Sequence, residues 1–131
     1  MPSASNIVVT YDNAAALVIA YLKPLVTPLE VHHDVPNTRP ATFIRILRTG
    51  GPRDGVLDLA QLTVESWAYA ADTAETNAQI VRRHLNNLVG QVLSLHPVYK
   101  VIELSGPHEL PDPLSDSRRV TWSAQVWIRG L

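Results

Sequence analysis

The last part of the chain alternates strictly between apolar and polar residues, and this period of two constrains the fold more than any other feature. Successive side chains of a β-strand point to opposite faces of a sheet, so the pattern predicts a strand with one buried face. The apolar positions are Val120, Trp122, Ala124, Val126 and Ile128, and the intervening positions are Thr121, Ser123, Gln125, Trp127 and Arg129. The chain should therefore contain a sheet that is covered on one side.

Four earlier segments also predict strands. Residues 29–35 and 61–69 alternate in the same way, and residues 42–48 and 98–104 are rich in β-branched and aromatic side chains. Two connections complete the pattern, and they differ in composition. Residues 49–55 contain three glycines and predict an exposed, mobile hairpin loop, whereas residues 105–117 are punctuated by prolines and predict a long loop.

Two segments predict helices. Asp12 is placed to cap a first helix over residues 13–25, which Pro24 and Pro28 should terminate because proline lacks the amide that a continuing helix needs. A second helix should begin with Asp72 as its cap. Its apolar residues recur at helical spacing, at Ala74, Ala78, Val81, Leu85, Leu88 and Val92.

The order of these elements is helix, three strands, helix and two strands, which predicts an α+β fold. One mostly antiparallel or mixed sheet of about five strands should carry both helices packed on a face. A chain of 131 residues suits a single domain over residues 1–131, because a split would leave two undersized cores.

Composition argues against several classes of function. The formal net charge is -1, which does not favour a protein that grips DNA through many phosphate contacts. Cysteine is absent, and with it thiol nucleophiles, disulfides and cysteine-based zinc sites. The longest apolar run, residues 14–22, is shorter than the roughly 20 residues that cross a bilayer, and residues 1–6 lack the basic charge of a secretory signal. We expect a protein that is made in the cytoplasm and contacts no membrane.

No residue pattern predicts a catalytic or cofactor-binding site. His32, His33 and Asp34 have side chains that can ligate a metal, but adjacent strand residues point to opposite faces, so His33 could not join the other two. The other histidines are scattered, and we interpret them as solvated or locally bonded: His84, His96 and His108. No serine lies in a nucleophile-elbow pattern, and the glycine-rich segment matches no phosphate-binding fingerprint. We expect no metal, no cofactor and no enzymatic activity.

A local excess of arginine indicates a subunit interface instead. Four arginines fall between positions 39 and 53 of a slightly acidic chain: Arg39, Arg45, Arg48 and Arg53. Such a cluster could meet nucleic acid or an acidic neighbouring subunit, and we favour the subunit. Four further candidates for this interface are Trp67 and Tyr69, which share a face of their predicted strand, and Trp127 and Arg129 in the last strand. Core packing and an interface suit the aromatic residues equally well.

Several short motifs follow one another in a recognisable order. They are the pairs Val35-Pro36 and Arg39-Pro40, Phe43-Ile44-Arg45 leading to Thr49-Gly50-Gly51, Leu62-Thr63-Val64-Glu65-Ser66-Trp67-Ala68, and Val81-Arg82-Arg83 in the second helix. With the opening helix and the order of elements over residues 12–131, the chain resembles the tail terminator proteins of long-tailed bacteriophages, a family similar to tail completion and gpU-like proteins. The resemblance is closest to phages that infect actinobacteria.

The resemblance implies a structural virion protein. Proteins of this family form a ring, commonly a homohexamer, that caps the tail tube, stops tail polymerisation and provides the head-tail joining surface. The implied partners are further copies of the chain, the major tail tube protein and the head-tail connector or stopper protein. Genomic DNA would pass through the lumen without specific binding. The implied location is the neck or tail of a siphovirus virion that assembles in the host cytoplasm.

Three other functions compete with this one. The nearest is a head-completion or stopper protein of the same neck, which would bind the portal side. A more distant alternative is a small metal-dependent hydrolase that uses His32, Asp34 and His108, and it requires a bound metal ion. A nucleic-acid module built on the arginine cluster is the third, and its binding would weaken steeply with salt.

Overall fold

Two long antiparallel strands form the centre of the sheet. In the computed structural model, which describes residues 8–131, β4 (Leu57–Ala68) and β7 (Arg118–Arg129) pair over their full lengths. The alternation that predicted the last strand is confirmed, because all five of its apolar positions are buried. The strand predicted over residues 61–69 is also confirmed, within β4, which begins four residues earlier and ends at Ala68. Its burial alternates only at the start, because every residue from Val64 to Ala68 is buried.

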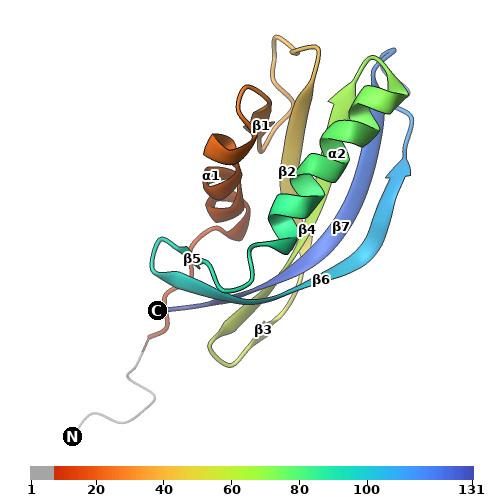
Figure 1. The fold of residues 1–131 in the computed structure, drawn as a ribbon. Coiled ribbons are helices and arrows are strands. Elements are labelled where there is room, and N and C mark those ends of the chain that lie inside the picture. Colours follow the sequence, from red (N-terminus) through yellow and green to blue (C-terminus); the bar gives the residue numbers. More distant parts are fainter. Residues whose placement is uncertain (1–7) are drawn as a thin grey trace, which may run out of the picture.

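The other strands extend this pair on both sides (Figure 1). The strand order is β1-β2-β4-β7-β6-β5, and β3 pairs with β4 outside this path. The bounds are β1 (Glu30–His32), β2 (Phe43–Gly50), β3 (Arg53–Asp54), β5 (Val92–Leu93) and β6 (His96–Glu109). The pairing of β1 with β2 is parallel and the other pairings are antiparallel. The fold is α+β as predicted, and the sheet has seven strands because β3 and β5 add two residues each.

Both helices, α1 (Ala14–Val26) and α2 (Ala71–Asn86), lie on the same face of the sheet (Figure 1). The hydrophobic core fills the layer between them and the strands, with Trp122 as its largest fully buried side chain. Burying each large apolar side chain contributes about 1.5–3 kcal/mol. We call the opposite side of the sheet, which neither described helix covers, the helix-free face. Neither helix has the length and apolarity to cross a bilayer.

The first helix differs from the prediction at both ends. Asn13 is its cap in place of Asp12, because the Asn13 side chain accepts a hydrogen bond from the Ala16 amide at 3.1 Å. Pro24 lies inside the helix and does not end it. A proline there leaves the carbonyl of Ala20 without its helical partner, but both residues are exposed, so water can take the place of that bond.

The second helix starts one residue before its predicted cap. Asp72 therefore lies in the first turn of α2, and Ala70 occupies the cap position without a side-chain hydrogen bond. The predicted apolar stripe is buried from Ala74 to Leu88. Val92 is the exception, because the helix has already ended and the residue is exposed in β5.

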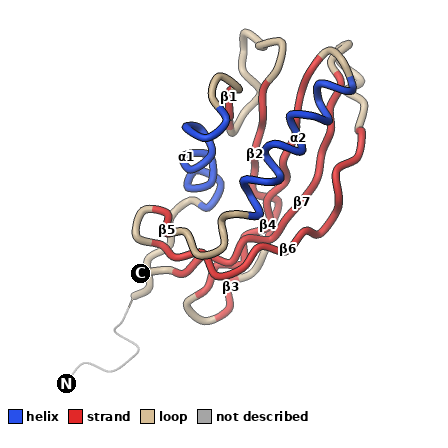
Figure 2. The backbone as a smooth tube through the Cα atoms, viewed as in Figure 1, coloured by secondary structure: helices blue, strands red, loops and turns tan. Residues whose placement is uncertain are grey.

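β1 and β6 differ most in length from the prediction. β1 covers only three of the seven predicted residues, since the chain bends at His33, whose carbonyl accepts a hydrogen bond from Arg45 Nε at 3.0 Å. β6 continues to Glu109, so the predicted long loop shrinks to residues 110–117 (Figure 2). Pro107 is tolerated there because it lies at a shift in register, where the strand needs fewer ladder hydrogen bonds.

Candidate functional site

A row of aromatic and cationic side chains crosses the helix-free face of the sheet. Phe43 of β2 and Trp67 of β4 are partners in the strand register, and their rings stack with centroids 5.4 Å apart. Trp67 and Arg119 of β7 are also register partners, and the guanidinium lies 5.1 Å from the indole centroid. The edge of the His32 ring meets Phe43 at 6.4 Å. These four strands therefore share one contact ladder, which fixes their positions on this face.

Glu65 supplies the negative charge of this ladder. Its carboxylate lies 3.3 Å from Arg45 Nη1 and 3.5 Å from Arg119 Nη1, and it also accepts the indole N–H of Trp67 at 3.3 Å. The Glu65 side chain is almost completely buried, so these donors compensate for the loss of water around its charge. Arg45, which the sequence suggested as a contact to a partner, thus has an acceptor within its own chain.

Arg39 joins two loops at the same end of the sheet. Its guanidinium lies 5.0 Å from the ring centroid of Trp67 and donates hydrogen bonds to Asp112 at 3.3 Å and to the Ser115 hydroxyl at 2.9 Å. Hydrogen bonds from Ser115 and from the Leu114 amide lower the pKa of the Asp112 carboxyl below its ordinary value, with a smaller contribution from Arg39. The loop between β6 and β7 is therefore tied to the loop that precedes β2.

The glycine-rich segment between β2 and β4 is also held in place. Arg48 forms two hydrogen bonds of 2.7 Å with the Asp58 carboxylate, which raise the pKa of its guanidinium. The same guanidinium donates to the carbonyls of Gly50 at 3.0 Å and Gly51 at 2.9 Å. The segment predicted as a mobile loop thus contains the short strand β3 (Arg53–Asp54), and hydrogen bonds from Arg48 restrain its glycines. Arg53 extends outward from it and lies 3.9 Å from the ring centroid of Tyr11.

The remaining candidate residues lie apart from this ladder. Trp127 packs under Lys100 at 5.1 Å and donates its indole N–H to Gln125 at 2.9 Å. Arg129 donates to the hydroxyl of Tyr99 at 3.2 Å. Tyr69 follows the end of β4 and is 64% exposed, whereas Trp67 is only 4% exposed. The structure therefore brings together Arg39, Arg45 and Trp67, and separates them from the other candidates.

The histidines do not gather around a common point. His32 bonds Glu30 at 2.9 Å and His33 bonds Asp34 at 3.2 Å, so the two imidazoles have different carboxylate partners. Within residues 8–131, no group of three or more histidine, cysteine or acidic side chains is arranged to hold a metal ion. His108 lies near the Gly106 carbonyl, at 2.9 Å.

The interpretation of His96 as a solvated or locally bonded histidine is wrong, because this residue is buried and its partners are distant in the sequence. It is buried at the start of β6, with Nδ1 2.7 Å from the Arg129 carbonyl and Nε2 3.0 Å from Asp12. It therefore links the segment before α1 to β6 and to the end of β7. No local sequence motif predicts this role, because the two partners of His96 lie 33 and 84 residues away in the chain.

The sequence also failed to single out Arg119 and Glu65. The alternation could have identified both, because it assigns them to the same sheet face as two candidate tryptophans. Arg119 alternates in step with Trp127 along β7, and Glu65 alternates in step with Trp67 along β4. Their pairing depends on the register between the two strands, in which Glu65 lies opposite Thr121 and Trp67 lies opposite Arg119. Periodicity gives the face of each residue but not the register.

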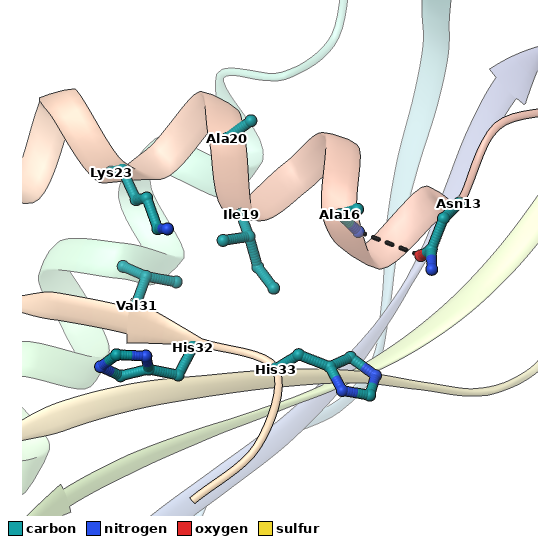
Figure 3. Close-up of a pocket in the computed structure, with 8 residues that line it drawn as sticks. All are labelled: Asn13, Ala16, Ile19, Ala20, Lys23, Val31, His32 and His33. Atoms are coloured by element: carbon teal, nitrogen blue, oxygen red, sulfur yellow. Dashed lines mark hydrogen bonds between the residues drawn. The ribbon is translucent and has the colours of Figure 1, made fainter. Parts of the chain in front are cut away.

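A cleft of about 450 Å³ lies between α1 and β1 (Figure 3). Ile19 and Lys23 point from the helix toward β1, and Val31 points back toward the helix. The full lining is Asn13, Ala16, Ile19, Ala20, Lys23, Val31, His32 and His33. The cleft combines an apolar floor with polar and basic groups on its rim, a combination that suits the binding of a ligand or of a protein segment.

Comparison with known proteins gives matches of two kinds, to a family model and to solved structures. The family model described as phage tail termination protein matches residues 10–130, from the segment before α1 to the residue that follows β7. Seven chains of solved structures also match significantly. One belongs to a structure described as the virion of a native gene transfer agent particle, with 19% sequence identity, a TM-score of 0.60, and coverage of 89% of this chain and 87% of that chain. At this identity the likeness shows a shared fold. None of the curated protein sequences matches significantly.

Proposed function

Because the chain belongs to the phage tail termination protein family, and is thus a structural protein of tail completion, we propose that it forms a ring that caps the tail tube. The ring stops tube polymerisation and provides the surface that joins the tail to the head. The observation that carries this proposal is the extent of the family match, which covers both helices and all seven strands. The ring is a homohexamer that assembles in the host cytoplasm and becomes part of the virion.

The proposed partners are other copies of the chain, the major tail tube protein and the head-tail connector. Genomic DNA passes through the ring without specific binding. The charge pairing supports this last point, because the arginines at positions 39, 45 and 48 each have a carboxylate partner within the chain. DNA binding is driven by counterions that leave the DNA when arginines neutralise its phosphates. An arginine already paired with a carboxylate neutralises phosphate less well, so it contributes little to DNA binding.

The candidate contact residues fall into two groups. Tyr69, Arg53 and Arg129 are exposed and can meet a neighbouring subunit directly. Arg48 is exposed as well, but its guanidinium is bonded to Asp58. The other candidates are buried or half-buried and support the surface through contacts within the chain: Arg39, Arg45, Trp67 and Trp127. Exposed aromatic and arginine side chains are the types enriched at protein interfaces.

The test is to add the purified chain to tail tube subunits as they polymerise. We expect electron microscopy to show a ring at one end of each tube, and light scattering to show that elongation stops. A variant with Tyr69→Ala should assemble more weakly, whereas Val8→Ala, which changes an exposed residue outside the candidate surface, serves as the control. Particles that remain monomeric both alone and with tubes would contradict the proposal.

The same preparation separates tail termination from the neighbouring role of a head stopper. A pull-down with tube subunits on one resin and portal or adaptor protein on another measures which partner the ring prefers. Binding to the tube supports tail termination. Binding to the portal side alone would reassign the protein to the head side of the neck.

A further inference from the structure

The cleft between α1 and β1 has an apolar floor and an unpaired cation on its rim. Ile19 and Val31 form the floor, and Ala16 takes up little space on the helix side (Figure 3). Lys23 is exposed, and no carboxylate within residues 8–131 forms an ion pair with it. The side-chain oxygen Oδ1 of Asn13 accepts the capping hydrogen bond of α1, which leaves the side-chain nitrogen Nδ2 able to donate to an incoming backbone carbonyl. An occupant with one apolar side chain, one carboxylate and a free backbone carbonyl would satisfy all three features.

The loop between β6 and β7 presents this combination. Leu114 is 90% exposed, the largest exposed fraction among the exposed large hydrophobic residues of the described chain. Asp116 lies two residues further on, is exposed, and also has no ion-pair partner among residues 8–131. A leucine in this position stays in water at a free-energy cost unless another surface covers it.

Hydrogen bonds restrain the backbone of the loop around Leu114. The Asp112 carboxylate accepts hydrogen bonds from the Leu114 amide at 3.1 Å and from the Ser115 hydroxyl, and Arg39 donates to both Asp112 and Ser115. The loop therefore has little conformational freedom to lose when it docks. Such preorganisation strengthens binding because less entropy is lost on association.

The cleft and the loop lie at different parts of the molecule. β1 is one end of the strand order, whereas β6 and β7 lie on the other side of β4 (Figure 1). A contact between two different surfaces of identical chains is heterologous, and repeated contacts of this kind close into a ring when the rotation allows it. The loop of one copy can thus meet the cleft of the next copy around the whole assembly.

We propose that the α1–β1 cleft receives Leu114 from a second copy of this chain, with Asp116 of that copy beside Lys23. Ile19 and Lys23 are four residues apart on α1, which is about 6 Å along the helix axis. Leu114 and Asp116 are two residues apart, a separation that the backbone spans by at most about 7 Å, so the two pairs are compatible in spacing. The proposal rests on the ring-forming function proposed above and names the contact that builds the ring. His32 and His33 on the rim are bonded to Glu30 and Asp34, so Lys23 is the cation that remains for the incoming carboxylate.

Absence of cysteine from the chain allows a direct test by cross-linking. Two single variants, Ala16→Cys and Leu114→Cys, are purified separately, mixed and oxidised under conditions in which the unmodified chain forms rings. We expect a disulfide-linked dimer in the mixture on a non-reducing gel, since each contact then pairs one cleft with one loop. The control mixture replaces Ala16→Cys with Val89→Cys, an exposed position outside both surfaces. Equal yields from the two mixtures would overturn the proposal.

A second measurement uses the concentration at which rings form. Leu114→Ser should raise this concentration roughly tenfold to hundredfold, because it removes a leucine that the contact buries. Lys23→Glu and Asp116→Lys should each raise it about two- to fivefold, and the double variant should restore it. Val89→Ser should leave it unchanged. Because Leu114, Lys23 and Asp116 are exposed, these changes should leave the fold intact, which circular dichroism can check.

The outcomes separate this inference from the proposed function. If the unmodified chain forms no ring either alone or on tubes, the ring itself is wrong. If rings form normally in every variant, the ring stands and this contact is wrong. If Lys23→Glu weakens assembly but Leu114→Ser does not, a different segment occupies the cleft, and the proposal is overturned as well.

Discussion

The guanidinium of Arg48 and the carboxylate of Asp58 face each other in a two-pronged ion pair, with both N–O distances at 2.7 Å. The Asp58 side chain is only 4% exposed, so the pair holds a nearly buried negative charge. Arg48 also donates to two backbone carbonyls of the segment that follows it, those of Gly50 and Gly51. One side chain thus neutralises the charge and fixes the path of the chain between β2 and β4.

Arg48→Met should lower the free energy of unfolding by about 2 kcal/mol or more, because it leaves the Asp58 charge buried without a partner. Urea titration followed by circular dichroism measures this change. Arg53→Met is the matched control from the same hairpin, since that arginine stacks on Tyr11 and forms no ion pair among residues 8–131. Its loss should cost less than about 1 kcal/mol. Equal effects of the two substitutions would show that the ion pair does not stabilise the fold.

Trp67 and Tyr69 should respond very differently to truncation, although they belong to the same phase of one sequence pattern. Trp67→Ala removes a buried ring from between Phe43 and the arginines, so we expect a loss of about 3–5 kcal/mol in the free energy of unfolding. Tyr69→Ala changes an exposed residue and should alter stability by less than about 0.5 kcal/mol. Thermal unfolding of both variants tests the contrast, and a large loss in Tyr69→Ala would contradict it.

These two residues also show how far the sequence predicts the fold. Alternation predicted the buried phase of β4 and β7 because burial on a sheet repeats every two residues. It could not predict that Tyr69 lies just past the end of β4, since strand ends depend on where the chain turns toward α2. The contact between Trp67 and Arg119 could not be predicted from the sequence either. The two residues are 52 positions apart, and only the register between β4 and β7 places them side by side.

Helix ends and loops gave the other errors. Both Asp12 and Asn13 are good capping residues. Asn13 caps α1 because the Asp12 carboxylate is bonded to His96. That bond spans 84 residues, so no local pattern reports it. The sequence showed that arginines are dense between positions 39 and 53. It did not show that Arg45 and Arg48 have acceptors within the chain, because those contacts depend on strand pairing.

Gly51→Ala should be the most damaging of the glycine substitutions. Gly51 has a φ of 99°, and an added Cβ would lie 1.9 Å from the Leu59 carbonyl oxygen, so both the backbone and the packing oppose it. We expect a loss of about 3 kcal/mol, or failure to fold. Gly106→Ala is the control, because a Cβ there meets nothing within 4 Å and its φ lies outside the left-handed region. The yield of soluble protein and urea titration measure both, and a neutral result for Gly51→Ala would show that the turn can rearrange.

The ion pair between Arg82 of α2 and Glu103 of β6 should make stability depend on pH in the acid range. The guanidinium binds both carboxylate oxygens, and this hydrogen bonding lowers the pKa of Glu103 below its ordinary value of 4.5. A carboxyl whose pKa is lower in the folded chain than in the unfolded chain stabilises the fold above the unfolded pKa. That contribution is lost as the pH falls through the lower, folded pKa.

Glu103→Gln should therefore lower the free energy of unfolding by about 0.5 kcal/mol near pH 7, which is the size expected for a partly exposed pair. The difference from the unmodified chain should stay constant down to about pH 5 and then shrink toward zero as Glu103 becomes protonated. Asp116→Asn is the matched control, because this exposed carboxylate has no ion pair among residues 8–131, and the difference should be small at every pH. Urea titrations between about pH 3 and 7 measure both curves. A difference for Glu103→Gln that persists unchanged at the acid end would show that the carboxylate does not act through its charge, and that the contact of α2 with β6 depends on packing alone.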